Sequence, residues 1–266
     1  MRHRTGLILL AIMALAAALA PHFLPAPNAQ PDPLHLALLA PGVGHWLGPD
    51  QLSRDVLARV VAGARVSLTV AFLAVAVSMS LGAGAGLVAG YLGGAVDAVL
   101  MRLVDGALAI PRLFYLLLAA AAWERMPIAA FILMLGLTGW FTTSRLVRGE
   151  VLRLRHEAFV EAAEAMGASR ARVILRHLLP NAAGPLLVAA TLAVGDVILL
   201  EAGLSFLGVG IRPPTASWGG MILEGKDVLA VAPWVSIAPG VAIVVTVLAV
   251  SLVGESIRTS LDPRTR

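Results

Sequence analysis

Cysteine is absent from this sequence, which excludes disulfide bonds and cysteine-ligated metal sites. Charge is also scarce: charged residues form 14% of the 266 residues and hydrophobic residues 59%. A soluble domain is typically about 25% charged. Several apolar runs reach the roughly 20 residues that cross a bilayer. The sequence therefore predicts an all-α, polytopic membrane protein with about six transmembrane helices.

Enzyme motifs are missing too. There is no H-E-x-x-H or G-x-S-x-G, and the six histidines are scattered rather than paired at metal-ligand spacing. Gly220 to Lys226 has the spacing of a phosphate-binding loop, but Asp227 follows where Ser or Thr would hold magnesium. We expect no catalytic residue, metal or cofactor. The basic residues are mostly loop arginines, a topology signal, so nucleic acid is not an expected partner.

Six spans are expected, at residues 6–24, 66–90, 95–122, 127–143, 182–204 and 234–253. The first also fits a signal peptide cleaved after Ala18-Leu19-Ala20, but later spans already anchor the chain, which favours an uncleaved helix. An interfacial helix is expected from Leu52 to Arg65, before the second span. Trp123-Glu124-Arg125 is expected to form a tight outer turn.

Basic residues predict the orientation. An even number of spans puts both termini and the central polar stretch on one side, which holds at least twelve arginines against six basic residues opposite. The positive-inside rule makes that side the cytoplasm of a bacterium, with the chain in the inner membrane. The twelve are Arg2, Arg4, Arg145, Arg148, Arg153, Arg155, Arg170, Arg172, Arg176, Arg258, Arg264 and Arg266; the six are Arg54, Arg59, Arg65, Arg125, Arg212 and Lys226.

Glycine recurs every fourth residue in the second span, and two interpretations are open. This face can pack against another helix of the same chain, or it can lie at a subunit or gate interface. The glycines are Gly82, Gly86, Gly90 and Gly94.

Charges near or within apolar spans are candidates for a translocation pathway, because they are costly in lipid and usually face a cavity or partner. Asp105 and Arg112 lie seven residues apart, about two turns of one helix face. Asp196 and Glu201 are about 140° apart around a helix, so they would not share a proton.

The longest polar stretch, residues 157–185, predicts a pair of short helices. The first has a small apolar face and ends at Gly167, a suitable C-cap glycine. Ser169 can N-cap a second helix, which Pro180 should end. An apolar face on a charged membrane loop indicates contact with another protein. Its residues are Phe159, Ala162, Ala163 and Met166.

These residues resemble the signature of the permease subunits of bacterial ABC importers: Glu-Ala-Ala, a glycine four positions on, then Leu-Pro. The match consists of Glu161, Ala162, Ala163, Gly167, Leu179 and Pro180. His177 departs from the usual apolar residue, and the run from Arg176 to Asn181 resembles the di-/oligopeptide and nickel branch. Glu201 to Gly208, Ser217-Trp218-Gly219 and Asp262-Pro263-Arg264 resemble that branch too, whereas Ser251 to Glu255 departs from it mildly.

The resemblance implies a type I ABC importer permease fold with cytoplasmic coupling helices. Residues 1–65 would hold the first helix and an extracytoplasmic segment, 66–255 the permease core with a coupling loop at 145–185, and 256–266 a cytoplasmic tail. Implied partners are a homologous second permease, two cytoplasmic ATPases that hydrolyse ATP, and an extracytoplasmic substrate-binding protein. The implied ATPase-coupling residues are Phe159, Glu161, Ala162, Ala163, Met166, Gly167, Leu179 and Pro180.

Alternatives remain open. Within the branch the substrate is a peptide, nickel or glutathione. A secondary transporter driven by ion gradients through Asp196 and Glu201 is a second class, and an intramembrane acid-catalysed enzyme a third. For Glu161, the alternative to partner contact is a surface ion pair with Arg170 or Arg172.

Overall fold

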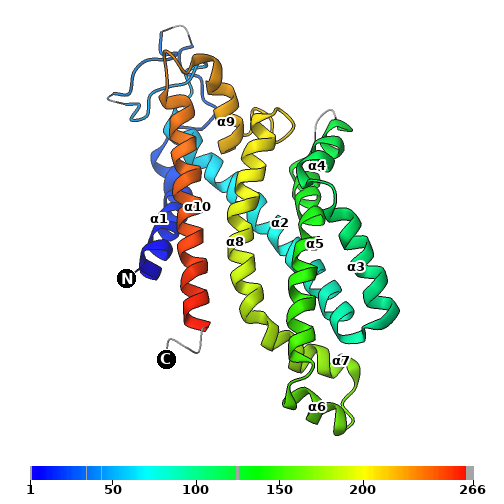
Figure 1. Ribbon diagram of the computed structural model, residues 1–266. Coiled ribbons are helices and arrows are strands. Elements are labelled where there is room, and N and C mark those ends of the chain that lie inside the picture. The colour runs from blue at the N-terminus through cyan, green and yellow to red at the C-terminus, as the bar shows by residue number, and fades with distance from the viewer. Residues whose placement is uncertain (1, 34, 43, 124–125, 262–266) are drawn as a thin grey trace. The chain divides into compact units, whose positions relative to one another are not determined.

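The computed structural model describes the whole chain except residues 1, 34, 43, 124–125 and 262–266, and the described part is helical with no β-strand (Figure 1). The outer turn expected at Glu124-Arg125 and the tail at Asp262-Pro263-Arg264 lie outside the described residues. The helices are α1 Arg2–Phe23, α2 Val56–Leu92, α3 Gly94–Leu108, α4 Arg112–Ala121, α5 Ile128–Leu154, α6 Ala158–Ala165, α7 Arg170–Val173, the π-helical turn η1 Ile174–Leu178, α8 Leu179–Phe206, α9 Trp218–Gly225, the 3-10 turn η2 Lys226–Val228 and α10 Trp234–Leu261.

The chain divides into two compact units. Unit 1 comprises Met1–Phe72, Ala120–Phe131 and Val194–Val253. It holds α1, the long α1–α2 connection and α9. Unit 2 comprises Leu73–Ala119, Ile132–Ala193 and Gly254–Arg266. It holds α3, most of α5, and α6 and α7, which lie together at one end of the unit (Figure 1).

Four helical segments of the described chain are long and apolar enough to cross a membrane, and a fifth counts if α3 and α4 form one span. The expected number of about six is therefore approximate. The third expected span is broken: α3 and α4 meet at an angle of 78°. Pro111 lies at the break, where its ring and missing N–H prevent a continuous helix.

The interfacial helix expected at Leu52–Arg65 does not exist as a separate element. Asp55 caps a helix that begins at Val56 and continues through the second span to Leu92, its Oδ1 accepting a 2.7 Å hydrogen bond from the Ala58 N–H. No proline interrupts the run, so nothing separates an interfacial part from the span.

The loop predicted to couple to an ATPase is shorter than expected because helices extend into it from both sides. α5 continues to Leu154, eleven residues past the predicted span end at Thr143. Pro180 does not end the second short helix: residues Arg170–Phe206 form one continuous helical segment. The π-helical turn before Leu179, whose N–H bonds the Ile174 carbonyl, widens the backbone just ahead of Pro180. Only about residues 155–169 leave the two long helices.

Three glycines of the second span pack against α5 of the same chain, in unit 2. A β-carbon on Gly86 would lie 2.6 Å from the Ser144 carbonyl oxygen, and one on Gly82 or Gly90 would meet Thr143 or Val151 equally closely. Packing within the chain is therefore the correct interpretation for these three. Gly94 does not belong to the face, because it begins α3 with a φ of 56°.

We expect Gly86→Val to lower the free energy of unfolding by about 1–3 kcal/mol, because the added side chain overpacks a closed helix contact. Thermal unfolding of the purified protein in detergent measures this. Gly84→Val is the matched control, since a β-carbon there meets no atom within 4 Å. Equal midpoints for the two variants would contradict the assigned contact.

Candidate functional site

The turn between the two short helices forms as its residues predict. Gly167 follows α6 with a φ of 78°, in the left-handed region that side chains avoid. Nothing lies within 4 Å of a β-carbon built on Gly167, so the backbone angle and not space requires glycine. Ser169 caps α7 by accepting a hydrogen bond from the Arg172 N–H. Both predicted caps are confirmed.

The inner face of the helix pair joins the core of unit 2. Val160 of α6, Val173 of α7 and Leu178 are buried with side chains of α2 and α5, among them Val151. Ala163 of α6 is buried as well. Burial of this apolar surface holds α6 and α7 on the ends of two long helices, at about 25 cal/mol for each Å² removed from water. The pair is thus a packed part of unit 2 and can move with it as a rigid body.

A polar bond adds to this attachment. The Tyr91 hydroxyl, near the end of α2, donates a 2.8 Å hydrogen bond to the Glu164 carboxylate of α6. Tyr91 is buried in the same core. Its bond to Glu164 therefore restricts the orientation of α6 relative to α2, in addition to the apolar packing that holds α6 in place. This pair could not be predicted from local sequence signals, since 73 residues separate Tyr91 and Glu164.

The outer face of α6 carries most of the predicted coupling residues. Met166 is 82% exposed and Phe159 is 40% exposed, although both are large and apolar. Ala162 lies between them at helical spacing and is exposed as well. Glu161 is also exposed, and within the described residues its carboxylate has no hydrogen bond or ion pair. The expected alternative, pairing with Arg170 or Arg172, does not occur here.

Two predicted coupling residues have a different environment. Ala163 is buried, so its methyl group packs inside unit 2 and not on the exposed face. Leu179 is partly buried against the same core, while Pro180 is exposed. The original grouping of Ala163 with Phe159 and Met166 on one face was therefore wrong. α6 is rotated so that Val160 and Ala163 point inward.

Ion pairs between α3 and α5 lie in the same unit. The Arg148 guanidinium forms a bidentate salt bridge with the Asp97 carboxylate, with Nε–Oδ1 and Nη2–Oδ2 distances of 2.5 and 2.6 Å. Asp105 pairs with Arg145 at the surface. Arg112, across the bend, donates a 2.5 Å hydrogen bond to the Leu135 carbonyl of α5. Asp105 and Arg112 therefore do not share one helix face, and their role in a pathway stays a prediction.

Glu201 in unit 1 is held by serine side chains, and its role in a pathway stays a prediction. It is fully buried, and its carboxylate accepts 2.9 Å hydrogen bonds from the hydroxyls of Ser67 and Ser205. Ser67 in turn accepts from the N–H of Trp218, the first residue of α9. Glu201 thus anchors α9 to α2 and α8. Asp196, five residues earlier and about 140° away around the helix, is exposed.

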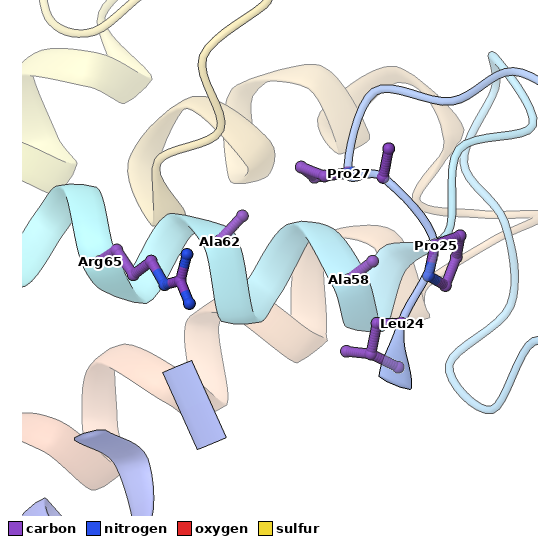
Figure 2. A pocket seen from close by; sticks show the side chains of 7 residues that line it. Leu24, Pro25, Pro27, Ala58, Ala62 and Arg65 are labelled. Atoms are coloured by element: carbon purple, nitrogen blue, oxygen red, sulfur yellow. The ribbon is translucent and has the colours of Figure 1, made fainter. Parts of the chain in front are cut away.

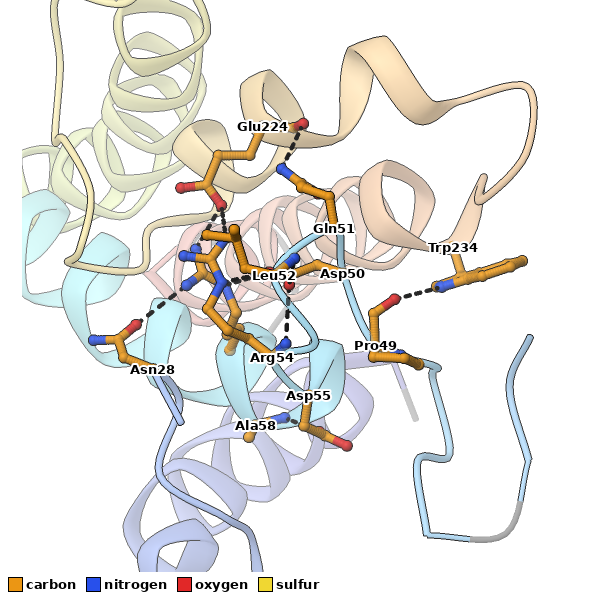
Figure 3. Close-up of polar contacts among 11 residues, drawn as sticks. Asn28, Pro49, Asp50, Gln51, Leu52, Arg54, Asp55, Ala58, Glu224 and Trp234 are labelled. Carbon is orange, nitrogen blue, oxygen red and sulfur yellow. Dashed lines mark hydrogen bonds and ion pairs between the residues drawn. The ribbon is translucent and has the colours of Figure 1, made fainter. Parts of the chain in front are cut away.

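A second group of buried charges in unit 1, which no local sequence signal predicted, surrounds Glu224 (Figure 3). Arg54 and Arg59 both donate to one oxygen of Glu224 in α9, over 2.6 and 2.8 Å. Arg54 also binds Asp50 over 2.6 Å, and Arg59 donates to Asn28. Arg59 is only 1% exposed. The cluster joins α9, the start of α2 and the α1–α2 connection.

We expect Glu224→Gln to destabilise the protein by about 3 kcal/mol, because two buried guanidinium groups lose a shared carboxylate. Chemical unfolding in detergent measures the change. Asp227→Asn removes an exposed acid three residues away and is the matched control. Equal stability of the two variants would show that the cluster is not a structural anchor.

A cavity of about 300 Å³ opens beside the same connection (Figure 2). Leu24, Pro25 and Pro27 form one side, and Ala58, Ala62 and Arg65 of α2 the other, with Ala26 completing the lining. The lining is apolar except for Arg65. No described group of three or more His, Cys, Asp or Glu residues is arranged to hold a metal ion.

The sequence is similar to a known protein family and to several named proteins. Residues 82–266 match the family described as binding-protein-dependent transport system inner membrane component. A Brucella ovis protein named provisionally as a peptide permease is 40% identical over 97% of this chain and 86% of its own length. The dipeptide transport system permease protein DppC of Alkalihalophilus pseudofirmus is 36% identical, over 97% and 84%. The oligopeptide transport system permease protein OppC of Bacillus subtilis is 35% identical, over 98% and 85%.

Proposed function

Because the chain belongs to the binding-protein-dependent transport system inner membrane component family, we propose that it is a peptide-importing permease subunit driven by separate ATPases. It would form half of a translocation pathway with a homologous second permease. Relatives named as dipeptide and oligopeptide permeases, similar along nearly the whole chain, support peptides as the substrate class over nickel or glutathione.

The exposed face of α6 is the observation that carries the coupling proposal. Phe159 and Met166 would enter a groove of a cytoplasmic ATPase, and Ala162 and Gly167 would let the groove approach the helix closely. Val160 packs in the core of unit 2 and Ala163 is buried, so the other face of α6 is held in that unit. Closure of the ATPases on ATP would therefore move α6 together with the ends of α2 and α5, and not bend a loose loop.

The orientation and pathway are part of the proposal. The arginine distribution favours a cytoplasmic coupling loop and two cytoplasmic termini in the bacterial inner membrane. An extracytoplasmic binding protein would then deliver peptide on the side of the α1–α2 connection. Asp196 is the strongest remaining pathway candidate, because an exposed carboxylate within a span needs water or a partner. Glu201 is a weaker candidate, because its carboxylate is fully buried.

Reconstitution distinguishes this function from a secondary transporter. Liposomes containing the chain, its partner permease and both ATPases should accumulate labelled peptide only with binding protein outside and ATP inside. The chain alone should show no uptake under a proton or sodium gradient. Gradient-driven uptake by the chain alone, lost on Asp196→Asn, would contradict the proposal.

A further inference from the structure

A polar cavity of about 520 Å³ lies in unit 2 on the flank of the helix pair. None of the exposed coupling residues of α6 lines it, so it is separate from the proposed ATPase contact. Residues of four different helices and of the chain after α5 line it. Its lining residues are Tyr91, Leu92, Val96, Arg155, Glu164 and Arg170.

The cavity has an excess of positive charge. Arg155 and Arg170 are both exposed, and neither side chain has a hydrogen bond or ion pair in the described part of the chain. Glu164 is the one acid of the lining, and it accepts a hydrogen bond from Tyr91. Two guanidinium groups against one carboxylate leave one uncompensated positive charge, which favours an anion.

The N-terminus of α3 adds to the positive electrostatic potential of the cavity. Gly93 precedes the helix and has no side chain to cap it, so the first N–H groups of this 15-residue helix lack a side-chain cap. Arg155 lies close to this end, its Nη1 being 3.6 Å from the position of a β-carbon on Gly93. A helix dipole and a guanidinium group therefore reach the same side of the cavity.

An apolar stripe leads away from the cavity along α3. Val96 lines the cavity, and Val99 and Leu103 follow at three and seven residues, on the same helix face. All three are exposed, Val99 to 68%. A cationic cavity that continues into an exposed apolar stripe is complementary to a phospholipid, in which a phosphate group is followed by acyl chains.

We propose that this cavity binds the phosphate headgroup of an anionic phospholipid, whose acyl chains lie along Val96, Val99 and Leu103. Arg155 and Arg170 hold the phosphate from two sides. Since Arg170 belongs to α7 and Glu164 to α6, the bound lipid braces the helix pair against α3. Under the orientation proposed above the lipid comes from the cytoplasmic leaflet, but the binding itself does not depend on transport.

Native mass spectrometry of the detergent-purified transporter, with its partner subunits, tests the site. The probes are dioleoyl phosphatidylglycerol, dioleoyl phosphatidylcholine and inorganic phosphate, each added separately. We expect phosphatidylglycerol to be retained about tenfold more than phosphatidylcholine. Arg155→Gln with Arg170→Gln should abolish that preference, while Arg153→Gln with Arg172→Gln, an equal loss of charge outside the cavity, should keep it.

Other outcomes overturn the proposal. Equal preference in both double variants would show that general surface charge, and not the cavity, attracts the lipid. Inorganic phosphate that binds and displaces phosphatidylglycerol would identify a site for a soluble anion. Retention by the isolated chain that is lost when the ATPases assemble would assign the two arginines to a protein partner. Because no transport is measured, these outcomes stay distinct from failure of the proposed function.

Discussion

Gly167→Asp is expected to reduce ATP-dependent peptide uptake at least about tenfold while the protein still inserts into the membrane. The left-handed backbone at Gly167 disfavours a side chain by about 1–2 kcal/mol, a local cost that the core of unit 2 tolerates. The larger effect is functional. A charged side chain at the end of α6 would be buried without a partner where the ATPase approaches.

Gly167→Asn is the matched control, because asparagine has nearly the same shape, tolerates the left-handed region and carries no charge. Uptake in this variant should stay within about threefold of the parent chain, since only the strain is shared. Membrane-fraction immunoblots check insertion of both variants. Full uptake with Gly167→Asp would contradict a close partner contact, and equal loss in both variants would indicate backbone strain alone.

Glu161→Lys is expected to have a similarly large effect. The Glu161 carboxylate is exposed and has no partner among the described residues, so reversing its charge breaks no internal contact. The thermal midpoint of the chain should therefore be unchanged. Uptake should fall at least about tenfold, because a like-charge contact at an interface costs several kcal/mol.

A second exposed glutamate supplies the control. Glu255→Lys makes the same charge change in α10, away from α6, and should leave both uptake and co-purification of the ATPases intact. Loss of ATPase co-purification with Glu161→Lys alone would locate the defect at the coupling loop. If the two lysine variants transport equally well, Glu161 is a solvated surface charge.

Local chemistry predicted the centre of the proposed coupling loop well. Gly167 and Ser169 act through bonds within a few residues of themselves, so their types alone indicate where α6 ends and α7 begins. The rotation of α6 was not predictable in the same way. Alanine fits either face of a helix, and only the packing of Val160 in the core of unit 2 decides that Ala163, three residues further on, is buried as well.

The structure differs from the sequence predictions where contacts between distant residues override local signals such as proline. Pro180 is a strong stop signal, but the preceding π-turn and the buried Leu178 and Ala182 keep the helix continuous. The buried charge cluster in unit 1 was not predicted because Arg54 and Glu224 are 170 residues apart in the sequence. A weak signal was present: Asp50, Arg54, Asp55 and Arg59 are unusually dense charges for a chain with 14% charged residues.

The absence of native cysteine allows a direct test of the coupling proposal, since one introduced cysteine is unique in the chain. Met166→Cys should form a cross-link to an ATPase subunit in membranes treated with a short thiol-reactive amine cross-linker, and ATP should change its yield. Leu229→Cys, exposed at a site in unit 1, should form none. A cross-link to the ATPase from Leu229→Cys but not from Met166→Cys would contradict the account of α6 as the coupling element.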